Sequence, residues 1–468
     1  MPNPIPDESV QPALLEIASE AENLEKASAG RETASQAPVR LRQPQRRQYE
    51  MVTQCRDDLI GANHPARIVV KVVERLDLTA FYQPIKAREG EAGRDFTDPR
   101  LLVELWLYAC IRGIGAAREL KRRCDESLPF QWLCGGVSVN HRMLSEFRTA
   151  HGEALDQLFT QVVAALVEQG VVKVSRISQD GVRVRVGVGA SSFRREERLR
   201  QLLAEAVQHV EELKRQVEEP AYGVRAKAKR AAAEQSRAQE KLQRLEKAIE
   251  QLPAIQEQME AAAKNAGRGK KAEKIRARQP RVSTTDPEAR VMKMANGGFN
   301  PAANVQLATD TESRAIVGIT VTNIGSDNVN LSAPMREQVE LRTGRKVDQH
   351  LMDGGFLKID DIEQAHEKRV EIFVPPKPAR KQENRGHELD AKPGDSEAIL
   401  AWKQRMSREE GKEIYKLRAS TSETVNADLR RNRGLQSIMV RGKDKGTCVV
   451  LWCALAYNIL RFWPVLVK

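Results

Sequence analysis

The sequence predicts an α/β protein in which an all-α N-terminal domain precedes a core of strands and helices, and in which a helical hairpin interrupts that core. Three observations carry this prediction. Helical periodicity dominates to about residue 170, Val and Arg alternate over residues 171–188 as in a strand, and residues 192–277 are charged and return to a helical period. The remaining strands and helices follow this insertion.

Composition favours a polyanionic partner. The 468 residues hold 76 Lys and Arg against 64 Asp and Glu, a net charge of +12, which suits nucleic acid or an acidic membrane surface. Six cysteines occur without a Cys-x-x-Cys pair, so neither a zinc site nor a disulfide framework is expected. We expect reduced, buried thiols in a cytoplasmic protein.

No membrane partner is expected. The first thirty residues are polar and lack the charged-then-apolar pattern of a signal peptide, and residues 1–48 are predicted to be a flexible arm. The most apolar segment, Cys448 to Leu460, is too short to span a bilayer. It is predicted to be a buried core helix.

Residues 49–170 are predicted to form a helical DNA-binding domain. Within it, GIGAARELKRRCDES and SVNHRMLSEFR predict two short basic helices separated by Pro129 and by Gly135-Gly136, an arrangement compatible with a helix-turn-helix-like unit. An ordinary helical bundle with a basic solvent face explains the same residues. The sequence leaves both interpretations open.

Residues 194–280 are predicted to be a coiled-coil insertion. Two apolar seams with heptad spacing indicate two helices that can pair as an antiparallel hairpin. The first seam consists of Leu199, Leu203, Ala206, Val210, Leu213 and Val217, and the second of Leu242, Leu245, Ile249 and Leu252.

The core is expected in pieces on either side of this insertion. Its first strand region is residues 171–193, it continues over residues 281–374, and its C-terminal helices occupy residues 399–468 after a linker at 375–398. The predicted elements are strands at 304–308 and 316–322, a helix at 332–341, and strands at 349–352 and 370–374.

Asp180 is the carboxylate with the strongest local argument. In a continuous strand it shares a face with Val182, Val184 and Val186, and a carboxylate among apolar side chains is costly unless it is paired, for example with a divalent cation. The alternative is that Gly181 ends the strand and leaves Asp180 in a turn.

Two further carboxylates have ordinary local explanations as well as functional ones. Asp353 ends an apolar run and precedes two glycines, which suits either an open metal or phosphate site or a simple turn. Glu423 fits a capping box with Ser420 at the start of a late helix. Asp310, in a predicted hairpin tip, is the substitute candidate should Asp353 fail.

Several segments resemble the DDE transposases of bacterial insertion sequences, in the group with a helical N-terminal domain and a C-terminal Tyr-Arg-Glu signature. SQDGVRVR resembles the first-Asp strand of that family, LMDGGF its second-Asp strand end, and YKLRASTSETVNADLRRNRGL its glutamate helix. The signature falls at Tyr415, Arg418 and Glu423, with Arg430 where lysine is common. The spacing before Glu423 is one residue longer than the usual form.

The resemblance implies an RNase H-like catalytic core, a mixed sheet with flanking helices, whose metal-binding catalytic residues are Asp180, Asp353 and Glu423. It implies two Mg²⁺ ions, with Mn²⁺ as a possible substitute, for a two-metal phosphoryl transfer. The expected activity is cleavage at the ends of an insertion sequence and strand transfer into target DNA.

DNA is the expected partner, as terminal inverted repeats and as target. Expected DNA contacts are Arg118, Lys121, Arg122, Arg123, Arg142 and Arg148 in the helical domain and Tyr415, Arg418 and Arg430 in the core. We expect a homodimer or higher oligomer on DNA and a location in the bacterial cytoplasm at the nucleoid. Two alternatives stay open: a non-catalytic DNA-binding coiled-coil protein, and an inactive transposase-derived protein.

Overall fold

The computed structural model describes residues 55–86, 95–218, 225–265, 267, 269–325, 330–378 and 386–468, and four single residues before them, 47, 49, 51 and 53. The predicted arm, apart from Arg47, and residues 379–385 of the predicted linker lie outside the described residues. The chain divides into two units, Met1–Gln54 and Cys55–Lys468, and every element below belongs to the second.

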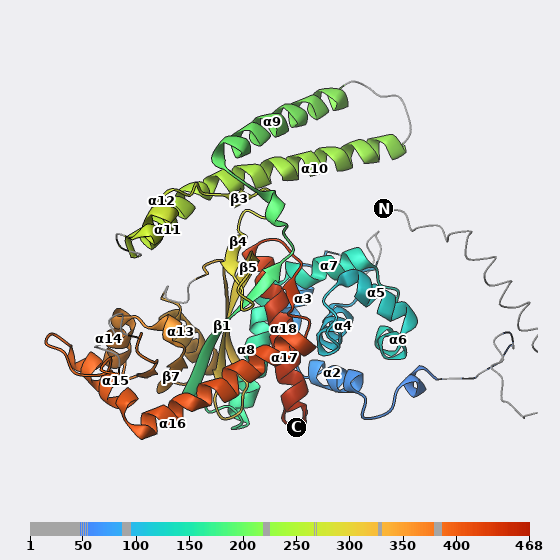
Figure 1. The fold of residues 1–468 in the computed structure, drawn as a ribbon. Coiled ribbons are helices and arrows are strands. Elements are labelled where there is room, and N and C mark those ends of the chain that lie inside the picture. The colour runs from blue at the N-terminus through green and yellow to red at the C-terminus, as the bar shows by residue number, and fades with distance from the viewer. Residues whose placement is uncertain are drawn as a thin grey trace, which may run out of the picture. The chain divides into compact units, whose positions relative to one another are not determined.

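The N-terminal part of this unit is helical, as predicted (Figure 1). Asp98 caps the longest early helix by accepting a hydrogen bond from the Arg100 backbone, and a proline opens that helix. The elements are η1 (Arg56–Leu59), α2 (Pro65–Val73), α3 (Thr79–Tyr82), α4 (Pro99–Ile111), α5 (Ala117–Glu126), α6 (Leu128–Cys134), α7 (His141–Ala150) and α8 (Gly152–Glu168).

One detail of this region differs from the sequence-based prediction. Pro129, which we expected to separate two helices, lies in the first turn of an additional helix, α6, where a missing backbone N–H costs no helical hydrogen bond. Gly135 then ends α6 in the left-handed conformation. The two basic helices are therefore α5 and α7, with α6 between them.

A mixed sheet forms the core. Its strand order is β4-β5-β1-β7-β8, with β6 pairing with β5 and β9 pairing with β1. The pairs β1–β5, β4–β5 and β5–β6 are antiparallel, whereas β1–β7, β7–β8 and β1–β9 are parallel. The strands are β1 (Arg176–Val186), β4 (Arg290–Lys293), β5 (Phe299–Asp310), β6 (Ile316–Thr322), β7 (Gln349–Met352), β8 (Glu371–Phe373) and β9 (Ser437–Ile438).

The central strand β1 runs through Gly181 without a break, so the turn alternative for Asp180 is excluded. Its even-numbered face is covered by a helical segment from near the C-terminus, because the Ser178 and Ser422 hydroxyls lie 2.6 Å apart across that contact. Sequence alternation therefore identified the strand correctly.

Helices surround the sheet (Figure 1). Gly318 of β6 lets one of them approach closely, since a Cβ there would lie 2.6 Å from the Met335 sulfur. The core helices are α13 (Ser332–Thr343), α14 (Ile359–Glu367), α15 (Glu397–Ser407), α16 (Glu409–Arg418), α17 (Thr424–Asn432) and α18 (Lys443–Leu466), with short turns η3 (Gly354–Phe356) and η5 (Ala419–Glu423).

The apolar C-terminal segment lies within α18, a helix that is long and apolar enough to cross a membrane by composition, but 72% of its apolar window is buried inside the protein. Asn458 of α18 donates to the Ile316 carbonyl and accepts from its N–H, so this helix also covers the edge of β6. The prediction of a buried core helix for this segment is confirmed.

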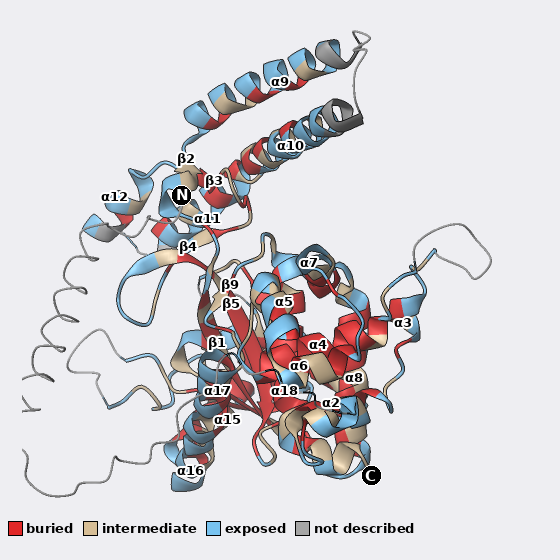
Figure 2. Cartoon of the chain, turned by 90° about the vertical axis from the view of Figure 1, so that its right-hand side faces the viewer, coloured by how far each residue is buried: buried red, intermediate tan, exposed pale blue. Residues whose placement is uncertain are grey.

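The insertion between β1 and β4 is helical, and its first and last segments pair as a small two-stranded antiparallel sheet. Figure 2 shows its two long helices largely exposed, with buried residues in a narrow stripe. Leu199, Ala206 and Val210 of the first helix and Leu245 of the second are buried there, which agrees with the predicted seams. The elements are η2 (Ala190–Ser192), β2 (Phe193–Arg194), α9 (Glu196–Glu218), α10 (Arg225–Glu250), α11 (Leu252–Asn265), α12 (Lys270–Arg276) and β3 (Val282–Ser283).

The second predicted seam is divided between two helices. Leu242, Leu245 and Ile249 lie on α10, whereas Leu252 opens α11. Leu199, Ala206, Leu245 and Leu252 of the two seams pack in one cluster that also includes Val282.

Candidate active site

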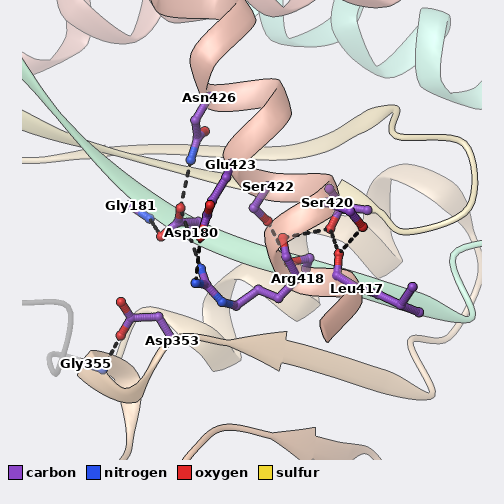
Figure 3. Close-up of polar contacts among 12 residues, drawn as sticks. Asp180, Gly181, Asp353, Gly355, Leu417, Arg418, Ser420, Ser422, Glu423 and Asn426 are labelled. Atoms are coloured by element: carbon purple, nitrogen blue, oxygen red, sulfur yellow. Dashed lines mark hydrogen bonds and ion pairs between the residues drawn. The ribbon is translucent and has the colours of Figure 1, made fainter. Parts of the chain in front are cut away.

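Asp180 lies near the middle of β1 with its carboxylate held on both oxygens. Oδ1 accepts a hydrogen bond from the Gly181 N–H at 2.9 Å, and Oδ2 accepts one from the Asn426 side-chain amide of α17 at 2.9 Å (Figure 3). The Asp180 side chain keeps 19% of its surface exposed. Asp180 shares a strand face with valines, so its carboxylate was expected to need a polar partner. These two hydrogen bonds supply such partners.

Glu423 lies at the end of a π-helical turn, η5, and not at a helix start. The helix continues from α16 through η5 into α17, and the Ser420 hydroxyl donates to the Leu417 carbonyl. The capping-box interpretation of Ser420 and Glu423 is therefore wrong. An extra residue in one turn shifts the side chains that follow it, and such π turns are frequent at functional sites.

Arg418 links Asp180 to Glu423. Its Nη2 donates to Glu423 Oε1 at 3.0 Å and its Nη1 lies 3.9 Å from Asp180 Oδ2, so both carboxylates converge on one guanidinium (Figure 3). Burial by itself would lower the pKa of Arg418, but the Tyr415 hydroxyl and the Asp180 and Glu423 carboxylates beside it outweigh burial and raise it. The guanidinium therefore remains charged.

Tyr415 completes this group from the same helix. The Arg418 guanidinium lies 6.0 Å from the centre of its ring. Burial raises the pKa of the Tyr415 hydroxyl, and the charges of Asp353 and Asp180 raise it further against the opposing effect of Arg418. The Tyr-Arg-Glu signature is thus assembled at Asp180.

Asp353 follows β7 directly, on the strand that runs parallel to β1. The register pairs Gln179 with Met352, so Asp180 and Asp353 occupy the next position on each of two neighbouring strands. Adjacent strands lie about 4.8 Å apart, which brings the two backbones close together. The Asp353 carboxylate itself accepts from the Gly355 N–H, as an Asx turn would require.

The three carboxylates are therefore gathered unequally. Asp180 and Glu423 both contact the Arg418 guanidinium, whereas the Asp353 carboxylate binds the Gly355 N–H of its own loop (Figure 3). Within the described part of the chain, no group of three or more His, Cys, Asp and Glu side chains is arranged to hold a metal ion. A third ligand at Asp353 would need a change of side-chain rotamer.

Asp310, the substitute candidate, has a structural role. Its side chain is 1% exposed, and it accepts hydrogen bonds from the Val174 N–H and from the N–H and hydroxyl of Ser313. It pairs with Ile177 in the sheet, toward the start of β1. The hairpin-turn explanation of Asp310 is confirmed, and it is no metal candidate.

A groove of about 730 Å³ begins beside Asp180, at Gly181. Arg185, Arg430 and Arg431 on its walls form no hydrogen bond or ion pair with the described residues, whereas Arg183 donates to the Gly325 carbonyl at 2.9 Å. The tip of the β4–β5 hairpin forms the opposite wall. The lining residues are Gly181, Val182, Arg183, Arg185, Met294, Ala295, Asn296, Ala427, Arg430, Arg431 and Gln436.

The basic residues predicted in the helical domain differ in availability. Arg118 and Arg142 are exposed and form no ion pair with the described residues. Arg122 and Arg123 both bind Glu119, and Lys121 binds Asp125.

Arg148 was predicted to contact DNA, and this is wrong because its side chain is inside the protein. It is 6% exposed, its guanidinium stacks 4.8 Å from the Trp106 ring centre, and it donates to the Gly115 carbonyl. A helical period with one basic residue among apolar ones does not show whether the arginine stem extends to solvent. The packing of α7 against α4 decides it.

Some site residues were missed or assigned to another role by sequence reasoning. Asn426 was missed as a site residue, and its amide holds Asp180. Arg183 and Arg185 alternate with valines on β1, and that alternation was a signal for a basic strand face. Only the tertiary fold places Arg183 and Arg185 in the same groove as Arg430 and Arg431.

The side chains present suit a hard divalent cation. Asp180 and Glu423 offer carboxylate oxygens, which are the ligands that Mg²⁺ prefers, and the Arg418 guanidinium between them shows that the pair already accommodates a positive charge. Asp353 is the nearest further donor by strand register. The donor set therefore fits a divalent metal through two residues and can recruit a third.

These features describe a carboxylate site on a mixed sheet beside a basic groove, as expected of an enzyme that acts on a phosphodiester. Residues 54–150 match the family described as Transposase domain (DUF772), and residues 376–463 match the family described as Transposase DDE domain. These two matches support an insertion-sequence DDE transposase.

The two matches cover the helical domain and the Tyr-Arg-Glu helix but not the residues between them, which include Asp180 and Asp353. No curated protein and no solved structure matches the chain. The assignment of the two aspartates therefore depends on the geometry above.

Proposed function

We propose that this transposase catalyses metal-dependent cleavage at the ends of its insertion sequence and joins those ends to target DNA, with Asp180, Asp353 and Glu423 as the catalytic carboxylates. The observation that carries the proposal is the convergence of Asp180 and Glu423, from a strand and a distant helix, on Arg418. The order of the strands supports an RNase H-like core, because three antiparallel strands continue into two strands parallel to β1.

The proposed cofactor is a pair of Mg²⁺ ions, for which Mn²⁺ can substitute, held by Asp180, Glu423 and a reoriented Asp353. When bound, such ions activate the attacking oxygen and neutralise the leaving oxygen of an in-line displacement. In the first displacement water attacks the phosphorus at the end of the element and a 3′-hydroxyl leaves. In the second, that hydroxyl attacks a target phosphodiester and displaces the 3′-oxygen of the target strand, which leaves as a new 3′-hydroxyl.

The protein's own residues bind and orient the substrate in these steps. Asn426 fixes the direction of the Asp180 carboxylate through its amide. Arg418 and Tyr415 sit beside the carboxylates, and Arg430 with the other groove arginines offers positive charge to the phosphates of a strand that leads to Asp180. The groove therefore supplies binding, and the carboxylates supply the chemistry.

The helical domain is proposed to bind the terminal inverted repeats through its exposed basic residues, chiefly Arg118 and Arg142. Two element ends handled together require two active sites, so we propose a homodimer or a higher oligomer on DNA. A cytoplasmic, nucleoid-associated location follows from a DNA substrate. A footprint on the repeats that survives removal of residues 1–150 would contradict the first of these proposals.

The test is a cleavage and strand-transfer assay on DNA that carries the element ends, with Mg²⁺ or Mn²⁺. Asp180→Asn, Asp353→Asn and Glu423→Gln should each lose activity by on the order of 100-fold or more while DNA binding remains. Glu413→Gln is the matched control, since Glu413 is an exposed acid on α16 paired only with Lys416.

Full activity in any of the three variants would show that the replaced residue is not a catalytic carboxylate. A wild-type protein that binds the element ends but cleaves nothing with either metal supports the non-catalytic or inactive alternative instead.

A further inference from the structure

The root of the insertion, where its helices meet the sheet, holds an open cavity of about 880 Å³, the insertion cavity. One side of it is lined by β2, α11 and the chain that leaves α12, and the other by β4 and the chain that follows β6. Arg290 of β4 joins the two sides, because its Nη2 donates to the Gln251 side chain, between α10 and α11, at 2.7 Å. This cavity shares no lining residue with the groove beside Asp180.

Arginines give the insertion cavity a positive charge. Arg195, Arg278 and Arg281 line it and are exposed, and their side chains form no hydrogen bond or ion pair with the described residues. No Asp or Glu is among the described residues that line the cavity. A fourth arginine, Arg290, is held by hydrogen bonds to the protein and is part of the wall. The charge that the cavity offers to a ligand is therefore of one sign.

The walls between these arginines are largely apolar. Phe193, Ile255, Met259 and Ile275 line the cavity from the insertion, and Val291 lines it from β4. A hollow with low-dielectric walls and charge of one sign focuses its electric field on an oppositely charged ligand. Guanidinium groups also match the geometry of phosphate oxygens. The insertion cavity therefore fits a ligand with several phosphates.

The insertion cavity adjoins the groove that begins beside Asp180. Met292 and Gly325 line the cavity, whereas Arg183 lines the groove and donates to the Gly325 carbonyl at 2.9 Å. Each strand of duplex DNA carries one phosphate per about 3.4 Å of helix axis. DNA that occupies the groove and continues past it therefore presents further phosphates to the cavity.

We propose that the insertion cavity is a second DNA-binding site of this chain, in which Arg195, Arg278 and Arg281 contact phosphates of the DNA that extends beyond the groove. The inference rests on the proposed function, which makes DNA the substrate. It gives the insertion a role in substrate binding that the heptad seams of its sequence do not indicate. The phosphates belong either to the element end or to the target, and the experiment separates these two sources.

The experiment measures DNA binding by the full-length protein with fluorescence anisotropy at several salt concentrations. One labelled duplex carries the element end, and a second duplex of the same length lacks it. Arg195→Ala, Arg278→Ala and Arg281→Ala combined should weaken binding and reduce the slope of log affinity against log salt by about 1 for each arginine. A reduction on the first duplex alone assigns the cavity to the element end, and one on the second alone assigns it to the target. A reduction on both shows that it binds the backbone of either DNA.

Two matched variants separate local contacts from net charge. Arg215→Ala, Arg230→Ala and Arg237→Ala combined remove the same charge from exposed positions of α9 and α10 that do not line the cavity. This control should keep the wild-type slope. Lysine in place of all three cavity arginines keeps the positive charge and should restore most of the slope that alanine removes.

An unchanged slope on both duplexes, or an equal loss from the control variant, overturns the proposal. A change in the oligomeric state of the DNA-free protein without a change in slope assigns the cavity to a contact between copies of the chain, and this also overturns it. The slope is measured without cleavage. A protein that cleaves nothing but loses slope in the cavity variant therefore contradicts the proposed function and supports this DNA-binding site.

Discussion

The helical domain and the groove beside Asp180 hold their cationic side chains in opposite ways. In the helical domain Arg122 and Arg123 are engaged by Glu119, and Arg148 is buried against an aromatic ring. In the groove Arg430 and Arg431 have no acidic partner among the described residues. Arg118 and Arg142 stay exposed and without an ion pair among the described residues of the helical domain, but the groove gathers its unpaired arginines around one hollow. The groove is therefore the stronger site for a polyanion.

The largest effect is expected from the groove. Arg430→Ala combined with Arg431→Ala should weaken DNA binding and reduce the slope of log affinity against log salt by about 2, because each phosphate contact contributes about 1. Fluorescence anisotropy at several salt concentrations measures the slope. An unchanged slope would mean that the groove does not carry the DNA backbone.

The buried arginine should affect folding and leave DNA affinity unchanged. Arg148→Met should lower the free energy of unfolding by about 2 to 3 kcal/mol, because the Gly115 carbonyl and the Trp106 ring lose their partner. Urea titration monitors stability. DNA affinity measured where the variant is fully folded should equal that of the wild type, and a specific loss of binding would restore Arg148 as a DNA contact.

A buried acid gives the helical domain a pH-dependent stability. Burial raises the pKa of Glu104 on α4 from 4.5 to about 7. Its contribution to stability is complete below pH 4.5 and is lost as the pH rises through 7, up to about 3 kcal/mol at 1.36 kcal/mol per pKa unit. Unfolding of wild type and Glu104→Gln at several pH values isolates this effect. Parallel pH profiles for the two proteins would contradict it.

The smallest effects are expected on α5. Arg122→Ala should change DNA affinity by less than about 2-fold, because its charge is already compensated by Glu119. Glu119→Gln should instead strengthen binding a few-fold by releasing two arginines. Titrations at one salt concentration suffice. A loss from Arg122→Ala as large as that from the groove would remove the contrast between the two regions.

Sequence by itself determined the strand that carries Asp180, the strand that ends before Asp353 and the apolar seams of the insertion. These features follow from periods of two residues in a strand and about three and a half in a helix, which short stretches of sequence record directly. The family resemblance located the Tyr-Arg-Glu helix, and the family matches confirm the family.

Only the tertiary structure decided which charges meet. The amide of Asn426 on Asp180, the meeting of Asp180 and Glu423 at Arg418, and the burial of Arg148 against Trp106 bring together residues that a local period cannot relate. A side chain's charge state and partners depend on what packs against it from elsewhere in the chain. The position of Asp180 could thus be predicted from its own strand. Its contacts with Arg418 and with the Asn426 amide, and the arginine groove beside it, could not.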